Sequence, residues 1–147
     1  SDGYKGQVMY QIGGGTETPL TAERLKAQDH KLVIHGREVY RFAVSRMVEM
    51  VQEEREKHPD LELGAVVPHQ VNARIIESAR EKLKLPVDRV YVNIDRYGNT
   101  SSASVPLALD EARRTGFFDD LDGTLVVMCA FGAGLTWGSM SLRWGRS

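Results

Sequence analysis

Residues 63–72 read Leu-Gly-Ala-Val-Val-Pro-His-Gln-Val-Asn, and the pattern of the chain changes within them. The apolar run at 63–67 is typical of a strand that is buried on both faces. From Gln70 to Leu83 the apolar residues fall on one stripe at helical spacing, which predicts a helix. His69 stands between the two. A buried strand that passes through a polar residue into a helix is typical of α/β proteins.

The same alternation of helices and strands continues on both sides of this stretch. Upstream, residues 37–57 have apolar positions at spacings of three and four and are followed by Pro59, which predicts a long helix. A strand is also expected at 6–12 and a polar loop at 16–31. Downstream we predict a strand at 89–94, a helix at 100–115 with Pro106 near its first turn, and strands at 124–130 and 137–144 joined by a tight turn at 132–134. The pattern predicts an α/β layer architecture with a mixed sheet flanked by helices.

Composition narrows the possible classes of function. The 147 residues suit one domain, and a formal net charge of −1 provides no basic field for binding nucleic acid. No run of roughly 18 apolar residues occurs, so no membrane span is predicted. The start has neither an apolar signal core nor an initiator Met, so we expect a cytoplasmic chain that is a fragment or has been processed. The single Cys129 cannot form an internal disulfide, which agrees with a reducing compartment.

Two polar segments lie where a predicted strand gives way to a predicted helix. The first contains His69, which can exchange a proton near neutral pH, or can simply cap a helix or lie in the core. The second, residues 97–102 (Tyr-Gly-Asn-Thr-Ser-Ser), contains Asn99. The amide of Asn99 can donate to an oxyanion; alternatively, the Asn, Thr and Ser residues of the segment simply cap a helix. Parallel neighbouring strands would bring both segments to one edge of the sheet, which favours a shared site.

Several other features are interpreted as structural. The Gly-Ala-Gly turn at 132–134 precedes a predicted strand rather than a helix, so it is not a nucleotide-binding loop; it is a hairpin turn, or a turn that points a backbone N–H at a ligand. Cys129 lies in an apolar strand and is predicted to be a buried thiol rather than a nucleophile. The remaining histidines have no ligand spacing, so no metal site is predicted. The charged residues 53–57 are expected to be a solvated helix end.

Four segments of the chain resemble the β-ketoacyl-acyl-carrier-protein synthase III family, in the family's order. They are 35–42 (His-Gly-Arg-Glu-Val-Tyr-Arg-Phe), 67–72 (Val-Pro-His-Gln-Val-Asn), 95–106 (Asp-Arg-Tyr-Gly-Asn-Thr-Ser-Ser-Ala-Ser-Val-Pro) and 130–138 (Ala-Phe-Gly-Ala-Gly-Leu-Thr-Trp-Gly). The resemblance covers nearly the whole chain. It implies the C-terminal half of a thiolase-like fold, with residues 36–147 as the domain. Residues 1–35 would be a strand and loop at the junction with an absent N-terminal half.

The resemblance also implies roles for individual residues. His69 and Asn99 match the family's catalytic histidine and asparagine. Phe131 matches its aromatic gatekeeper, and Ala133 matches the backbone donor to an oxyanion. The remaining matches are positions that contact pantetheine or dock an acidic carrier protein: Gly36, Asn72 and Ile75 for pantetheine, and Arg41, Arg74, Arg80 and Lys82 for the carrier protein. The chain departs from the family at Val71, where Ala is common, at Ala133, where Gly is frequent, and at His35, where the residue is usually small, apolar or acidic.

The activity implied by the resemblance is a decarboxylative Claisen condensation of acyl-CoA with malonyl-acyl-carrier protein, in fatty acid or polyketide initiation, without a cofactor. The nucleophilic cysteine of such an enzyme would lie in the N-terminal half. The chain is therefore expected to be active only with that half, in a homodimer that also binds acyl carrier protein. One alternative is a relative that forms esters, amides or ketones without decarboxylation. Another is a non-catalytic half that dimerises or serves as a scaffold for a carrier protein.

Overall fold

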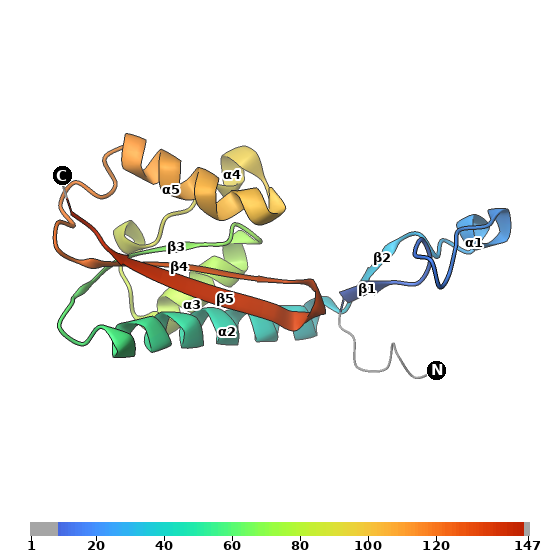
Figure 1. The fold of residues 1–147 in the computed structure, drawn as a ribbon, viewed down its shortest axis with the longest axis horizontal. Coiled ribbons are helices and arrows are strands. Elements are labelled where there is room, and N and C mark those ends of the chain that lie inside the picture. The colour runs from blue at the N-terminus through green and yellow to red at the C-terminus, as the bar shows by residue number, and fades with distance from the viewer. Residues whose placement is uncertain (1–8, 146–147) are drawn as a thin grey trace.

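The structure, a computed structural model, describes residues 9–145. Its main sheet contains β3 (Leu63–Pro68), β4 (Leu125–Gly132) and β5 (Thr136–Arg143), in the order β3-β4-β5. β3 is parallel to β4 and β4 is antiparallel to β5, so the predicted mixed sheet and closing hairpin are confirmed. Helices α2 (Gly36–Lys57) and α3 (Ala73–Leu83) cover one face of the sheet, and α5 (Ser104–Arg114) covers the other (Figure 1). The result is a three-layer α/β/α domain.

The side chains of β4 alternate between two hydrophobic cores on opposite faces of the sheet. Leu125, Val127 and Cys129 pack with buried residues of α2 and α3. Val126 and Met128 pack instead with buried residues of α5. None of these five side chains is more than 6% exposed. Because both faces of the strand are covered, its sequence is a continuous apolar run, and that run predicts the strand correctly.

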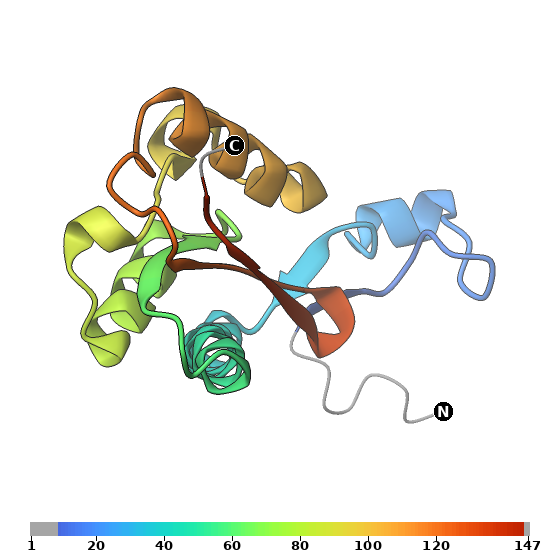
Figure 2. The same ribbon diagram turned by 60° about the vertical axis from the view of Figure 1, so that its left-hand side comes forward.

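A second, two-stranded sheet projects from the three-layer body (Figure 1, Figure 2). It consists of β1 (Met9–Gln11) and β2 (Leu32–Ile34), which pair antiparallel and flank α1 (Ala22–Lys26). The predicted strand at 6–12 is confirmed for residues 9–11, and residues 6–8 lie outside the described range. The prediction of a loop at 16–31 is wrong for α1. That helix has five residues and buries no side chain, so no apolar stripe marks it in the sequence.

The prediction of a strand at 89–94 is also wrong. Val90 forms a single isolated parallel bridge to Val66, and a short helix, α4 (Ile94–Tyr97), follows almost at once. The backbone N–H groups of Asn93 and Ile94 donate to the side chain of Gln70 rather than to a strand. An apolar run shows that a segment is buried, but it does not show which groups satisfy its backbone.

Both helices that follow the polar segments begin later than predicted. α3 begins at Ala73 because Asn72 is its N-cap, with Oδ1 accepting from the Arg74 N–H at 2.9 Å. α5 begins at Ser104, after a 3₁₀ turn at Ser101–Ala103. Pro106 lies in the first turn of α5, as predicted, where a missing N–H leaves no helix hydrogen bond unmade.

The expectation that residues 53–57 form a solvated helix end is wrong for Glu54. Its side chain, in the last turns of α2, is buried at 4% exposure. The carboxylate accepts hydrogen bonds from Ser139 Oγ at 2.8 Å and from Ser141 Oγ at 2.6 Å, both on β5, and from Lys57 Nζ at 2.8 Å. Glu54 therefore joins α2 to the outer strand of the sheet. Within residues 9–145 no helix, α2 included, is long and apolar enough to cross a bilayer.

Candidate active site

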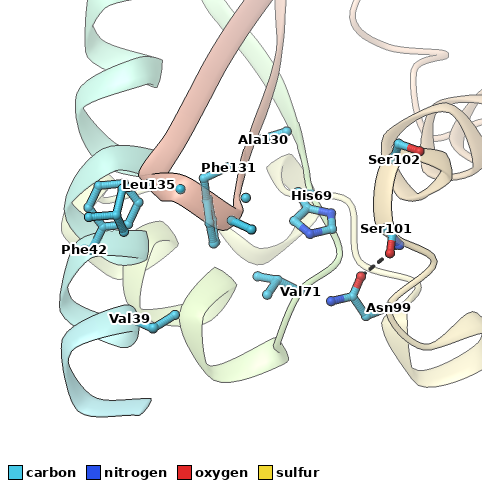
Figure 3. Close-up of a pocket in the computed structure, with 13 residues that line it drawn as sticks. Val39, Phe42, His69, Val71, Asn99, Ser101, Ser102, Ala130, Phe131 and Leu135 are labelled. Carbon is cyan, nitrogen blue, oxygen red and sulfur yellow. Dashed lines mark hydrogen bonds between the residues drawn. The ribbon is translucent and has the colours of Figure 1, made fainter. Parts of the chain in front are cut away.

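A cavity of about 750 Å³ opens where β3 ends and the β4–β5 turn begins. Figure 3 shows the rings of Phe42 and His69 on opposite sides of it, with Phe131 between them and Asn99 below His69. One wall is therefore apolar and the other carries polar groups. The lining consists of Val39, Phe42, His69, Val71, Asn99, Ser101, Ser102 and residues 130–135.

His69 follows the last residue of β3 and is held at both backbone and side chain. Its N–H donates to Cys129 O at 2.7 Å, and its Nδ1 lies 2.5 Å from Ser104 Oγ. The ring of Phe131 packs edge-on against the imidazole, with centroids 5.8 Å apart. Only 8% of the His69 surface is exposed, and this burial lowers the pKa of the imidazole from its ordinary value. At neutral pH His69 is therefore an uncharged imidazole.

The second ring nitrogen of His69 reaches the cavity. Among residues 9–145, every buried side-chain nitrogen or oxygen has a hydrogen-bond partner. The protein bond made by the ring uses Nδ1, through Ser104, and leaves Nε2 without a partner in the described chain. Nε2 must therefore be accessible, and the cavity is the space that His69 lines. A group bound in the cavity could accept from or donate to this nitrogen.

Asn99 presents its amide nitrogen to the same cavity. Its Oδ1 accepts from the Ser101 N–H at 2.9 Å. This bond turns the oxygen end of the amide toward the 3₁₀ turn at Ser101–Ala103. Figure 3 shows the opposite end, Nδ2, directed toward the cavity. Ser101 adopts a left-handed φ of 52°, which is uncommon for a residue other than glycine. Backbone strain of this kind tends to persist where the surrounding structure holds a functional side chain.

Gln70 connects the two segments that carry His69 and Asn99. It is 1% exposed, and its side-chain amide makes four hydrogen bonds to backbone groups. Nε2 donates to Pro68 O at 2.9 Å and to Tyr91 O at 3.1 Å. Oε1 accepts from the N–H groups of Asn93 at 2.9 Å and Ile94 at 3.2 Å. One side chain thus replaces the strand pairing that is absent beyond Val90. No pattern in the sequence marks this role, because a glutamine that follows a strand is not distinctive.

Glu111 of α5 fixes the short helix that precedes Asn99. Its carboxylate accepts from Asn93 Nδ2 at 2.7 Å and from the Tyr97 hydroxyl at 3.3 Å, and it forms an ion pair with Arg96 at 2.9 Å. Asn93 first, and then Arg96, lower the pKa of Glu111 below its ordinary value. The segment leading to Asn99 is therefore held from both sides, by Gln70 and by Glu111.

The apolar side of the cavity continues into a row of aromatic rings. Phe131 packs edge-on against Phe42 at 6.4 Å, and Phe42 against Trp137 at 5.9 Å. The Arg46 guanidinium lies 4.5 Å from the centre of the Trp137 ring. Ala133 begins the turn beside Phe131, and its carbonyl accepts from Thr136 Oγ1 at 3.2 Å. The backbone of the turn is thereby fixed at the edge of the cavity.

The structure brings some of the predicted site residues together and leaves others apart. His69, Asn99, Phe131 and Ala133 all line the cavity. The three residues assigned to pantetheine do not line it. Gly36 is the exposed first residue of α2, and Asn72 caps α3. Ile75 lies in the core and is 5% exposed.

The four predicted docking cations differ in how free their charges are. Arg41, Arg74 and Lys82 are exposed. Arg80 is held closely, since it donates to both carboxylate oxygens of Glu77 and to Leu85 O. Arg80 is therefore the least available of the four cations to a partner.

Cys129 is a buried thiol, as predicted. It is 2% exposed, and burial raises its pKa to about 12. A thiol in that environment is not ionised near neutral pH and cannot act as a nucleophile. The chain contains no other cysteine. In the range 9–145 there is also no group of three or more His, Cys, Asp or Glu side chains that could hold a metal ion.

The fold and the cavity together define the class of protein. A three-layer α/β/α domain with a mixed sheet, and with a histidine and an asparagine facing one cavity beyond a parallel strand, is a domain of the thiolase-like fold used by condensing enzymes. Comparison with known families then gives the particular family. The model described as 3-oxoacyl-[acyl-carrier-protein (ACP)] synthase III C terminal matches residues 54–144, and the chain belongs to this family.

Individual relatives agree with this assignment. A β-ketoacyl-[acyl-carrier-protein] synthase III of Caldanaerobacter subterraneus is 42% identical over 149 residues, covering 99% of this chain and 44% of the relative. One from Symbiobacterium thermophilum is 47% identical over 141 residues, covering 94% and 42%. The crystal structure of the synthase III from Thermus thermophilus matches with a TM-score of 0.73 at 42% identity, covering 94% of this chain and 42% of that one. The chain thus spans less than half the length of these relatives.

Proposed function

We propose that this chain is the C-terminal half of a 3-oxoacyl-[acyl-carrier-protein] synthase III, which condenses an acyl-CoA with malonyl-acyl-carrier protein. The observation that carries the proposal is the convergence of His69 and Asn99 on one cavity, with a nitrogen of each accessible there. The names of the relatives support the reaction class. Both residues suit one task, which is to donate hydrogen bonds to an oxygen that gains negative charge.

The first chemical step served by these donors is decarboxylation of the malonyl thioester. The bond between the carboxylate carbon and C2 breaks, CO₂ leaves, and the electron pair moves into the thioester to form an enolate. The thioester oxygen takes most of the new charge. Nε2–H of His69 and Nδ2–H of Asn99 donate to that oxygen, and they stabilise the transition state more than the ground state because the charge develops only there.

The second step forms the new carbon–carbon bond. The enolate carbon attacks the carbonyl of an acyl group held as a thioester on a cysteine, and the cysteine thiolate leaves. The proposed donor to the tetrahedral oxyanion is the backbone N–H of Ala133, in the turn fixed by Thr136. The nucleophile is proposed to come from the N-terminal half of the enzyme, because Cys129 is buried with its pKa raised to about 12.

The proposal includes the partners of the site. Pantetheine would approach along Gly36 and Asn72, which are exposed, whereas Ile75 would act only by supporting the wall from the core. The acidic carrier protein would dock on Arg41, Arg74 and Lys82, with Arg80 contributing less because Glu77 already neutralises it. A homodimer, independence of any cofactor and a cytoplasmic location complete the proposal.

The test is malonyl decarboxylation by the complete enzyme carrying His69→Ala or Asn99→Ala. Each change removes one donor to the enolate oxygen, so we expect the rate of CO₂ release to fall roughly 100- to 1,000-fold. The matched control is His58→Ala, an exposed histidine beyond the far end of α2. That variant should release CO₂ at the wild-type rate.

Two results would contradict the proposal. Decarboxylation at the wild-type rate by His69→Ala would remove the histidine from the chemistry. A wild-type enzyme that becomes acylated by acyl-CoA but never decarboxylates malonyl thioester would instead indicate one of the relatives that form esters, amides or ketones.

A further inference from the structure

Ser104 touches both of the residues that follow β3. It is the first residue of α5 and is only 2% exposed. Its Oγ lies 2.5 Å from Nδ1 of His69 and accepts from the backbone N–H of Gln70 at 3.3 Å. Ser104 does not line the cavity, so it can affect a bound group only through other residues, and the cavity-lining side chain that it contacts is that of His69.

Counting donors and acceptors assigns the protons in this cluster. A serine hydroxyl has one hydrogen and two lone pairs, and a neutral imidazole has one N–H and one bare nitrogen. The Gln70 N–H can only donate, so it occupies a lone pair of Oγ. If the hydroxyl hydrogen is directed to Nδ1, both bonds are complete and the ring proton lies on Nε2. If Nδ1 carried the proton instead, Oγ would accept two hydrogen bonds, one from Nδ1 and one from Gln70. The hydroxyl hydrogen would then have no partner among the hydrogen bonds that Ser104 makes in the described chain. Such a loss is costly because the hydroxyl is buried away from water.

We propose that Ser104 is a positioning residue that donates to Nδ1 of His69 and holds the imidazole as the tautomer with its proton on Nε2. The donor nitrogen then faces the cavity instead of the core. The use of this donor on a thioester oxygen rests on the proposed function, but the tautomer itself does not. The segment 99–104 thus serves the site twice, since Asn99 supplies one donor and Ser104 orients the other.

The same hydrogen bond also opposes protonation of the ring. An imidazolium has hydrogens on both nitrogens, so Nδ1 would have to donate to Oγ and the serine hydroxyl would have to turn away. Because Oγ also accepts from Gln70, the rotated hydroxyl would find no new partner within the cluster. Removal of the hydroxyl should therefore make His69 easier to protonate as well as freeing its tautomer.

The experiment compares wild-type enzyme with Ser104→Ala, each carrying ¹⁵N-labelled histidine, by imidazole NMR over a pH titration. The signals of His69 are identified by their loss in His69→Ala. In wild type we expect a protonated Nε2 and a bare Nδ1. In Ser104→Ala we expect both tautomers and a titration midpoint at higher pH. In the decarboxylation assay, kcat should fall about tenfold, the size of one hydrogen bond, with KM unchanged.

Matched variants separate positioning from general loss of stability. Ser141→Ala removes a hydroxyl bonded to Glu54, away from the cavity, and should leave the His69 spectrum and kcat unchanged. Ser104→Cys keeps a weak donor at nearly the same size and should fall between wild type and Ser104→Ala. Thermal unfolding of each variant shows whether it is folded.

The proposal is overturned if wild-type Nδ1 carries the proton, a result that needs no variant. It is also overturned if Ser104→Ala is folded and shows the wild-type tautomer and titration. A wild-type enzyme with the expected tautomer but without malonyl decarboxylation would contradict the proposed function and leave the role of Ser104 intact.

Discussion

At the scale of single residues, Glu54 shows how a buried charge can hold a strand to a helix. Its carboxylate is surrounded by Lys57, Ser141 and Ser139, and these partners, Lys57 first and then Ser141, lower its pKa to about 2 against an opposing effect of burial. The folded protein therefore binds the proton of Glu54 less tightly than the unfolded chain. Stability from this residue is present above the ordinary glutamate pKa near 4.5 and is lost as the pH falls toward 2.

We predict that Glu54→Gln destabilises the protein at pH 7 by about 2 kcal/mol. The shift in pKa would correspond to a larger value, but the side chain of Lys57 is 59% exposed and its contribution is screened by water. The difference in free energy of unfolding between variant and wild type should shrink as the pH falls from about 4.5 to about 2. Denaturant unfolding at a series of pH values measures both effects.

The control for this prediction is Glu53→Gln, the exposed neighbour of Glu54 on α2. It should change the free energy of unfolding by less than about 0.5 kcal/mol at every pH. A Glu54→Gln variant whose deficit stays constant down to pH 2 would show that the carboxylate is not stabilised as described.

At the scale of elements, β3 and the start of β4 lie too close together for a side chain between them. A Cβ built on Gly64 would overlap Oγ1 of Thr124 and lie 2.7 Å from its Cβ. Thr124 cannot simply move away, because its hydroxyl donates to Leu121 O at 2.6 Å. Gly64 therefore allows the two segments to approach, and the bulge in the register between Leu63 and Ala65 falls at the same point.

We predict that Gly64→Ala destabilises the protein by about 1–3 kcal/mol through this overlap. The matched control is Gly138→Ala, a strand glycine of β5 with nothing within 4 Å of the added methyl. Gly138→Ala should be neutral or slightly stabilising. Equal stability of the two variants in denaturant unfolding would contradict the packing argument.

Elements were predictable from the sequence where burial leaves a periodic trace. The long helix α2, the two-faced strand β4 and the closing hairpin have such patterns, and the structure confirms them. His69 and Asn99 could be paired because each follows a predicted strand. The prediction of a strand at 89–94 is wrong because the Gln70 side chain accepts from backbone N–H groups there. The burial of Glu54 was not predicted because its two serine partners are on β5, 85 and 87 residues away. Contacts made by single side chains over such separations have no local signature.

At the scale of the whole molecule, β4 is shared by both hydrophobic cores. Residues on one face belong to the core with α2 and α3, and residues on the other face belong to the core with α5. Neither layer of helices can leave the sheet without exposing one face of this strand. Opening of either core should therefore be coupled to opening of the other, as in a cooperative transition.

Cys129 provides a probe for this coupling. With 2% exposure and a pKa raised to about 12, its thiol should be alkylated at least about 1,000-fold more slowly in the folded protein than in denaturant. The measurement is iodoacetamide labelling followed by mass spectrometry of the peptide that contains Cys129. Labelling of the folded protein that is faster than its global unfolding permits would show that the α2–α3 side opens independently of the rest.

The bracing amide of Gln70 has a consequence for the lifetime of the protein when it is heated. Glutamine side chains lose ammonia slowly in hot water, and the product is glutamate. At this position the change would replace the donor Nε2 by an oxygen, which would face the carbonyl oxygens of Pro68 and Tyr91 without a hydrogen bond to either. One such event would remove two of the four hydrogen bonds by which Gln70 joins the segment of His69 to that of Asn99, while leaving the three layers in place. Aged preparations should then contain folded molecules in which these two segments are less firmly joined, and one extra negative charge would identify them.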